Sequence, residues 1–300
     1  MRISASIFVS SVSKSLIATA ALLLVAPFAA QAQSLGYEGP TGVFVTPLAY
    51  TSASPAKGVG NPSVSYHFLA GGPVIGDFST VSVTEGFAKR FEAGYTSEIH
   101  AGADPTGLWA SDFSIIHGKA TIISENAGKT KWVPAVAIGG ILRVNDNDAL
   151  DGKSGQTTKN GDIYAVATKV VTQIDKKVPV LLSAGIRGTN SSLWGLGGNA
   201  PDFAARGFGA LALVFTGPGK STIIVGSEVS QQPRRIKAGA AEALDIPTSE
   251  VYAVRIVPSP KHKLNVDGGV LHAGSNVAGG GVPLNLNARA RVAFGVSYGF

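Results

Sequence analysis

The chain has 300 residues, of which 45% are hydrophobic and only 15% charged, with 25 lysines and arginines against 19 acidic residues. The lack of cysteine excludes a disulfide framework, a thiolate metal site, a cysteine nucleophile and a lipid-modified cysteine. The formal net charge of +6 is too small to indicate binding to nucleic acid.

Residues 1–32 have the three parts of a secretory signal peptide. A basic start is followed by an apolar run that reaches Ala30, and Ala30-Gln31-Ala32 matches a signal-peptidase site. The apolar run is shorter than the roughly 20 residues that a membrane-spanning helix needs. We therefore predict export, with Gln33 as the first residue of the mature protein.

The remainder of the chain is too apolar for an ordinary soluble protein, in which about 25% of residues are charged. Its mean hydropathy is +0.23. No uninterrupted apolar run of 18 residues follows the signal peptide. In lipid, the alternative to helices is a closed β-barrel, because every backbone polar group must be satisfied within the protein. We therefore predict an all-β fold, a closed antiparallel transmembrane β-barrel formed by residues 63–300.

Residues 33–62 precede the predicted barrel and are rich in serine, proline and glycine. Residues 36–47 could pair as one strand, but an odd strand count would place the N-terminus outside the cell. Three alternatives stay open for this N-terminal segment. It folds into the lumen as a small plug, it lies on the periplasmic side, or it is a mobile tail.

From residue 63 onward, apolar and polar side chains alternate with the two-residue period of a strand. This pattern predicts twelve strands, with ten and fourteen as the alternatives. The expected strands cover residues 64–68, 78–84, 87–99, 112–123, 132–144, 164–170, 178–187, 207–216, 221–230, 251–257, 264–270 and 284–300. Hydropathy windows miss such strands, because their two faces average out.

The connections between these strands alternate in length. Short ones are expected near residues 85–86, 124–131, 173–177, 217–220 and 258–261. Longer ones are expected near 100–109, 145–161, 188–206, 231–249 and 272–283. Short periplasmic turns and long outer loops are typical of outer-membrane barrels. The rhythm predicts that the chain ends on the periplasmic side of the outer membrane.

The last expected strand, residues 284–300, alternates most clearly. Its even positions are apolar up to Tyr298 and Phe300, whereas its odd positions include Arg289 and Arg291. One face suits lipid, with aromatic side chains at the membrane interface, and the other face suits a wet lumen.

Three stretches resemble known outer-membrane proteins. Residues 85–95, EGFAKRFEAGY, are similar to a hairpin that recurs in Gram-negative outer-membrane barrels. Residues 162–169 and 185–198 resemble an uncharacterised proteobacterial family of exported, porin-like proteins. The resemblance implies an outer-membrane location and a barrel fold, and no reaction. It also implies that Tyr298 and Phe300 form the C-terminal signal that the barrel-assembly machinery recognises.

The final residues also spell G-x-S-x-G around Ser297, a pattern that can present a catalytic serine on a strand-to-helix turn. Only three residues follow Ser297, which leaves no room for that helix or for a downstream histidine. The five histidines of the chain form no metal-ligand pair such as H-x-H. We therefore predict no catalytic residue, no metal site and no cofactor.

Charged residues at the expected inward positions are the candidate functional residues, because side chains inside a barrel set the selectivity of a pore. These candidates are Arg90, Glu92, Arg143, Lys169, Arg187, Glu228, Arg255, Asp267, Arg289 and Arg291, with Glu98 beside them. Seven basic against four acidic residues indicate a weak anion preference. The alternative is that they form ion-pair ladders that hold a closed lumen.

The sequence thus favours a porin-like outer-membrane channel that passes small hydrophilic solutes by diffusion and is not an enzyme. The expected partners are the lipid bilayer, lipopolysaccharide, the barrel-assembly machinery and small solutes, without nucleic acid. The first alternative is a closed structural barrel or a component of envelope or surface-polysaccharide assembly. The second alternative is an outer-membrane hydrolase.

Overall fold

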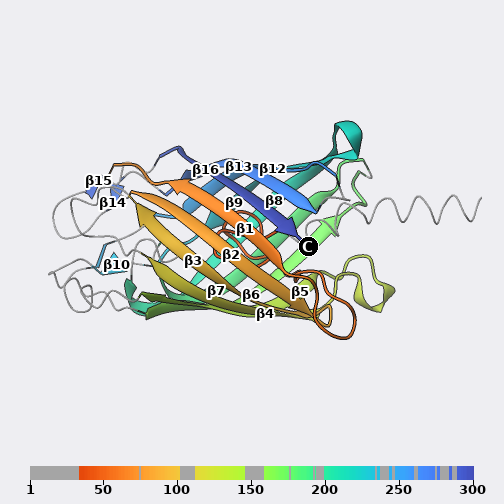
Figure 1. The fold of residues 1–300 in the computed structure, drawn as a ribbon, viewed down its shortest axis with the longest axis horizontal. Coiled ribbons are helices and arrows are strands. Elements are labelled where there is room, and N and C mark those ends of the chain that lie inside the picture. The colour runs from red at the N-terminus through yellow and green to blue at the C-terminus, as the bar shows by residue number, and fades with distance from the viewer. Residues whose placement is uncertain are drawn as a thin grey trace, which may run out of the picture.

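The computed structural model shows a closed antiparallel barrel of twelve strands (Figure 1). It describes residues 34–73, 76–101, 112–145, 159–175, 177–191, 193, 199–233, 235–236, 243–244, 247–259, 263–273, 276–277, 284–285 and 289–300. The barrel strands are β1 (Ser63–Ala70), β2 (Asp77–Phe87), β3 (Phe91–Ala101), β4 (Phe113–Ile123), β5 (Ala135–Asn145), β6 (Lys159–Val171), β7 (Val180–Ser191), β8 (Asn199–Thr216), β9 (Thr222–Ser230), β12 (Ser249–Val257), β13 (Leu264–His272) and β16 (Arg291–Gly299). The predicted fold class and the favoured strand count are confirmed.

Each barrel strand pairs with the next one along the chain, and the barrel closes between its first and last strands. In this closing pair, Ser63 of β1 lies opposite Gly299 of β16, and the pairing runs to Leu69 opposite Ala293. No edge strand is left in the barrel, so the backbone groups of its strands are satisfied by their neighbours. No helix among the described residues is long and apolar enough to cross a membrane.

The two ends of the barrel differ in their connections. At the end where the chain stops, which we call the C-terminal end, the connections are short and include residues 88–90, 172–179 and 217–221. At the opposite end, longer connections hold two small ribbons (Figure 1). These are β10 (Arg235–Ile236) with β11 (Ala243–Leu244), and β14 (Asn276–Val277) with β15 (Leu284–Asn285).

The alternation of side chains sorts the barrel into two faces. The outer face carries large hydrophobic side chains on its strands, including Ile163, which is 71% exposed. The inner face is mostly small, polar or charged, and its side chains are buried. This division follows from the strand period, and it agrees with the predicted faces of most strands.

Several strand boundaries differ from the prediction. The strand expected over 87–99 begins at Phe91, because Ala88 and Lys89 have positive φ angles of 49° and 57° and form a tight turn. The strand expected over 284–300 begins at Arg291, after Ala290 at φ 53°. The long connection expected over 188–206 is short, because β7 and β8 both extend into it.

The described part of the N-terminal segment lies inside the barrel. Residues 34–52, which we call the lumen segment (red to orange in Figure 1), are largely buried. They contact inward-facing side chains on strands that lie around the barrel, from β2 and β3 to β9 and β12. Two isolated bridges, Leu35 to Thr41 and Gly42 to Pro47, fold the lumen segment on itself. The predicted signal peptide and Gln33 lie outside the described residues.

Candidate functional site

The lumen segment is held by a carboxylate on β9. Glu228 accepts hydrogen bonds from the backbone amides of Phe44, Val45 and Thr46 at 2.6, 3.0 and 2.7 Å. The Thr46 hydroxyl donates to the same carboxylate at 2.7 Å. Three consecutive amides around one anion form a concave site of the kind that backbone turns offer to anions, and charge strengthens each bond.

A second contact comes from β12 and binds the carbonyls next to that turn. The Arg255 guanidinium donates to the carbonyl oxygens of Gly42 and Val43 at 3.0 and 2.9 Å. Its other side forms a two-bond ion pair with Asp267 on β13, at 2.6 and 3.0 Å. Arg255 is therefore fixed by one wall residue while it binds the segment.

A third contact lies on β3 and β4. Glu92 accepts hydrogen bonds from the amide and hydroxyl of Thr41, at 2.9 and 2.6 Å, and from the amide of Ser52 at 2.7 Å. Lys119 forms an ion pair with Glu92 at 2.8 Å and donates to the Thr41 carbonyl at 2.7 Å. Both side chains of this pair are fully buried. The pair thus binds the lumen segment at two places, Thr41 and Ser52.

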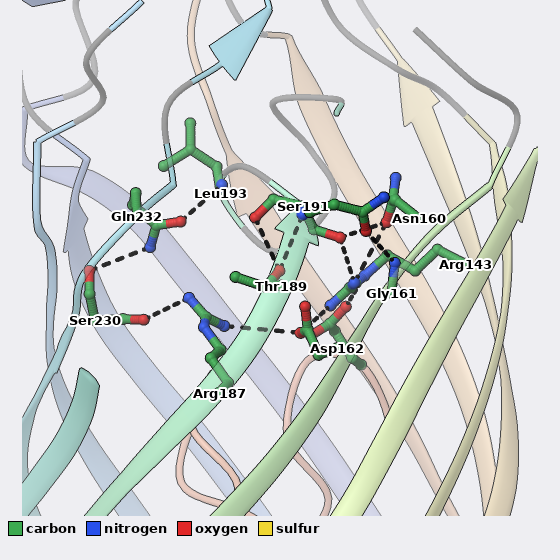
Figure 2. A network of polar contacts seen from close by, with 12 residues as sticks. Arg143, Asn160, Gly161, Asp162, Arg187, Thr189, Ser191, Leu193, Ser230 and Gln232 are labelled. Carbon is green, nitrogen blue, oxygen red and sulfur yellow. Dashed lines mark hydrogen bonds and ion pairs between the residues drawn. The ribbon is translucent and has the colours of Figure 1, made fainter. Parts of the chain in front are cut away.

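A polar network near the opposite end of the barrel centres on Arg143 (Figure 2). Arg143 donates to Glu38 of the lumen segment at 2.5 Å and to Asp162 at 2.9 Å. It also bonds Ser191 at 2.7 Å. Arg187 lies on the far side of Asp162, at 3.9 Å, and bonds Ser230 at 2.6 Å. Burial raises the pKa of Glu38, and the neighbouring Arg143 opposes that shift.

Threonine hydroxyls on the wall satisfy further carbonyls of the lumen segment. Thr84 donates to Gly39 at 2.8 Å, and Thr96 donates to Glu38 at 2.9 Å. Gly39 has φ 99°, and a Cβ there would lie 2.5 Å from the Thr96 hydroxyl oxygen. Glycine is therefore required at this position both by the backbone conformation and by the close approach to β3.

At the C-terminal end, a turn residue binds the lumen segment to the rim. Glu125, between β4 and β5, accepts hydrogen bonds from the Tyr50 hydroxyl at 2.8 Å and from Lys169 at 2.9 Å. The backbone amide of Val170 donates to it as well, at 2.9 Å. Burial and the nearby Glu125 carboxylate raise the pKa of Tyr50, so its phenol stays neutral and donates.

Part of the inner wall is apolar, which the alternation pattern did not reveal. Leu48 packs into a buried cluster with Val170, Leu181, Ala212, Val214 and Ile224 from β6 to β9. The cavity left between this wall and the segment measures about 20 Å³, close to the room needed for one water molecule. A wider recess of about 400 Å³ lies at the C-terminal end, lined by residues 53–55 and 59–61 with Lys263 and Phe300.

Six of the ten predicted lumen residues lie on the inner face and are buried. They are Glu92, Arg143, Arg187, Glu228, Arg255 and Asp267. Glu98 also points inward and accepts a hydrogen bond from Tyr37 at 3.1 Å. The structure thus brings these predicted residues together with the lumen segment, five of them in ion pairs and Glu228 and Glu98 in hydrogen bonds to the segment.

Of the other four predicted residues, Arg90, Lys169 and Arg289 were misplaced by the sequence reading. Arg90 lies exposed in the turn between β2 and β3, and Arg289 lies exposed before β16 begins. Arg291, the first residue of β16, lies on the predicted inward face with Ala293 and is half-buried at the rim. Lys169 shares the outer face of β6 with Ile163, because the inward positions of that strand are Asp162, Tyr164, Val166 and Thr168.

Sequence reasoning missed three charged residues of the lumen. Lys119 lies on a strand whose pattern is interrupted by apolar residues on both faces. Asp162 was missed because the prediction exchanged the two faces of β6, which put Lys169 inside. Glu38 belongs to the N-terminal segment, whose alternatives were left open. The pairing of Glu38 with Arg143 spans 105 positions along the chain, and no local pattern could have indicated it.

The serine of the G-x-S-x-G pattern is part of the wall. Ser297 lies inside β16, which pairs with β1 and β13, and its side chain is fully buried. His67 also points inward and is buried, with the Phe44 ring against it at 5.4 Å. Among the residues that the structure describes, no group of three or more histidine, aspartate and glutamate side chains could hold a metal ion.

Tyr298 and Phe300 lie at the C-terminal end and are exposed, with Tyr298 on the outer face. Their rings contact each other edge to face, with centroids 5.1 Å apart. The Lys263 ammonium and the Asn61 side chain bind the Phe300 carbonyl. Recognition of this end by the barrel-assembly machinery stays a prediction.

No family model and no curated protein matches the chain, so the resemblance to one particular uncharacterised family also stays a prediction. Solved structures of similar shape include the KdgM porin, at 12% identity and a TM-score of 0.45, covering 79% of this chain and 99% of that one. A NanC porin matches at 10% identity and 0.44, covering 80% and 98%. The β-domain of the Bordetella autotransporter BrkA matches at 10% and 0.38, covering 81% and 100%.

Proposed function

We propose that the protein is a porin-like barrel of the outer membrane. The support comes from the chain itself: an even number of antiparallel strands closes into a barrel with short connections at the C-terminal end. Its outer face carries exposed valine, isoleucine, leucine and aromatic side chains on strand after strand. A soluble protein rarely exposes an apolar surface that extends around the whole molecule, whereas lipid covers it.

We propose further that the lumen segment closes the channel at rest. The observation that carries this proposal is the set of wall charges that bind the segment's backbone: Glu228, Arg255 and the Glu92–Lys119 pair. A barrel of about eight strands is filled by its own side chains, whereas a wider one leaves space that a plug can occupy. Here the occupant is a separate stretch of chain, held by hydrogen bonds that displacement would break.

The wall beneath the segment suits small hydrophilic solutes. Displacing residues 34–52 would leave a lumen lined mainly by hydroxyl-bearing and charged side chains, with three apolar clusters that include Phe78, Ile115 and Leu181. The buried charged residues of the described strands are four cations, Lys119, Arg143, Arg187 and Arg255, and five carboxylates, Glu92, Glu98, Asp162, Glu228 and Asp267. Because these nearly balance, the anion preference expected from the sequence loses its support, and we propose weak charge selectivity.

A permanently closed structural barrel is the second candidate. The observation that favours it is the extent of ion pairing inside, which includes the fully buried Glu92–Lys119 pair. Such a barrel would keep its lumen segment docked under all conditions. It would act as a structural component of the envelope or bind other proteins of envelope assembly.

Conductance across a planar bilayer separates the two candidates. The mature chain should be largely closed, and the same chain without residues 33–62 should give steady openings with a reversal potential near zero in a KCl gradient. A shortened barrel that is folded and silent would overturn the channel proposal in favour of the structural one. Steady conductance of the intact chain would overturn the proposal that the segment closes it.

The control for the deletion is a change that keeps the chain length. Glu228→Gln removes the charge that binds three amides of the segment. Glu250→Gln instead removes a carboxylate of β12 that, among the described residues, binds the Tyr252 hydroxyl and no other group. Openings should become more frequent in the first variant and should stay at the level of the intact chain in the second.

A further inference from the structure

The C-terminal end of the barrel carries a belt of cationic side chains. Its six chain segments, residues 53–62, 88–90, 124–134, 172–179, 217–221 and 258–263, contain ten lysines and arginines and two acidic residues. The connections at the opposite end, residues 71–76, 102–112, 146–158, 192–198, 231–248 and 273–290, contain five basic and seven acidic residues. By sequence, the net positive charge of the connections therefore falls in the six segments at the C-terminal end.

Seven of these cations are exposed in the structure, and we call them the basic rim. They are Lys57, Lys89, Arg90, Lys129, Lys131, Lys177 and Lys220. None of the seven forms an ion pair with an acidic side chain among the described residues. Of the two acidic residues at this end, Glu125 is bound to Tyr50 and Lys169, and Asp175 accepts a bond from the Lys177 amide.

The basic rim follows the circumference of the barrel. Its members come from four successive turns, between β2 and β3, β4 and β5, β6 and β7, and β8 and β9, and from the loop before β1. Exposed apolar side chains lie in or beside the same turns: Phe91, Ile123, Trp132 and Ile174, the last two being 65% and 80% exposed. Cations thus adjoin the edge of the apolar outer face around much of the barrel.

We propose that the basic rim binds the headgroups of anionic phospholipids in the leaflet at the C-terminal end. A leaflet is the partner that surrounds the whole circumference, whereas a soluble acidic protein would contact one side or the centre. Lysine and arginine at an interface extend their charged groups toward phosphates while their stems stay against apolar chains. Each such cation near an anionic surface contributes roughly 1 kcal/mol, about a fivefold effect on binding.

The inference rests on the proposed membrane location and is independent of whether the barrel conducts. It predicts that anionic lipids are enriched around this end of the protein, and that salt, which screens exposed charges, reduces the enrichment. In the cell, such enrichment would fix the depth and tilt of the barrel from the inner side of the membrane.

Trp132 provides a local probe of this lipid shell. It lies next to Lys131, and the other two tryptophans, Trp109 and Trp194, fall in the sequence between β3 and β4 and between β7 and β8. The mature chain with W109F and W194F would be reconstituted in phosphatidylcholine vesicles. In one preparation, one lipid in five is brominated phosphatidylglycerol, and in the other it is brominated phosphatidylcholine. Bromine quenches tryptophan on contact.

The expected result is that the phosphatidylglycerol quenches Trp132 several times more strongly than the phosphatidylcholine does. K129Q with K131Q should remove most of this preference, and high salt should do the same. K159Q with R289Q removes two exposed cations at the opposite end and is the matched control. The preference at Trp132 should survive this second pair of changes.

Three results would overturn the inference. Equal quenching by the two lipids, or a preference that survives K129Q with K131Q, would show that the basic rim does not select anionic lipid and would favour a soluble acidic partner. An absence of quenching by either lipid would overturn the membrane location as well. Quenching of Trp132 does not depend on whether the barrel conducts, so these outcomes are distinguishable from failure of the channel proposal.

Discussion

The carboxylate of Glu228 binds both the backbone amide and the hydroxyl of Thr46, each at 2.7 Å, across 182 positions of the chain. This contact joins the wall of the barrel to a segment that precedes its first strand. It is surrounded by bonds to Phe44 and Val45, so a single side chain fixes the turn of the lumen segment. The proposed closed state of the barrel would depend on contacts of this kind, which substitutions can weaken one at a time.

Glu228→Gln should increase the fraction of time that the channel is open. A neutral amide offers one acceptor to a site of four donors, and its own NH₂ group would face the backbone amides. Loss of charge-assisted bonds of this kind costs about 2 kcal/mol, which corresponds to a roughly 30-fold change in the open-to-closed ratio. Single-channel recording measures that ratio. An unchanged ratio would show that Glu228 does not hold the segment in the membrane.

Gly39→Ala should destabilise docking more than Gly58→Ala does. Both glycines have nearly the same positive φ, 99° and 98°, so the backbone cost of alanine is about equal. A Cβ at residue 39 would lie 2.5 Å from Thr96, whereas a Cβ at residue 58 meets nothing within 4 Å. The rate of proteolysis within residues 34–52 should therefore be higher in Gly39→Ala than in Gly58→Ala, and the difference measures how closely the segment packs against β3. Equal rates of proteolysis within residues 34–52 would contradict this packing.

Lys119→Met should lower the stability of the barrel by about 3–5 kcal/mol, because it leaves the fully buried Glu92 carboxylate without its cation. Adding Glu92→Gln to this variant should recover part of the loss. Urea unfolding in lipid vesicles provides the measurement for the complete double-mutant cycle. Strict additivity of the two substitutions would show that the pair does not act as a unit.

Tyr50→Phe and Glu125→Gln should each loosen the lumen segment at the C-terminal end by about 1 kcal/mol. Their effects should add only in part, since the first removes the bond of 2.8 Å between these residues and the second removes the charge that strengthens it. Protease accessibility of residues 46–52 in the folded barrel measures the loosening. Ser54, which binds the Lys89 amide at 2.8 Å just beyond the lumen segment, provides a control: Ser54→Ala should leave the Tyr50–Glu125 coupling unchanged.

The barrel could be predicted from the sequence because its information is local. Alternation along β7 placed Arg187 inside and Leu182 outside, and the same reasoning was correct for Glu92 and Glu228. It failed for Lys169, where a one-residue difference in the reading of β6 exchanged the two faces. It also failed for Arg90, because the turn was expected near residues 85–86, whereas positive φ angles at Ala88 and Lys89 place it at residues 88–90.

The sequence could suggest that the lumen segment is a plug, but it could not show where the segment lies in the barrel. Its position depends on contacts between residues far apart in the sequence. Glu38 meets Arg143, and Gly42 meets Arg255, over separations of 105 and 213 positions. These contacts also change what the charges do: residues expected to line an open pore are bound to the segment or to one another. The apolar cluster around Leu48 escaped prediction for the same reason.

A reversible covalent lock tests most directly whether the lumen segment closes the barrel. The chain has no cysteine, so Ala49→Cys with Thr168→Cys introduces a single pair, at a place where the Ala49 amide and the Thr168 hydroxyl are 2.9 Å apart. This pair would be combined with Glu228→Gln. We predict that the oxidised protein stays closed and that reduction restores frequent openings. Equal conductance before and after reduction would contradict closure by the lumen segment.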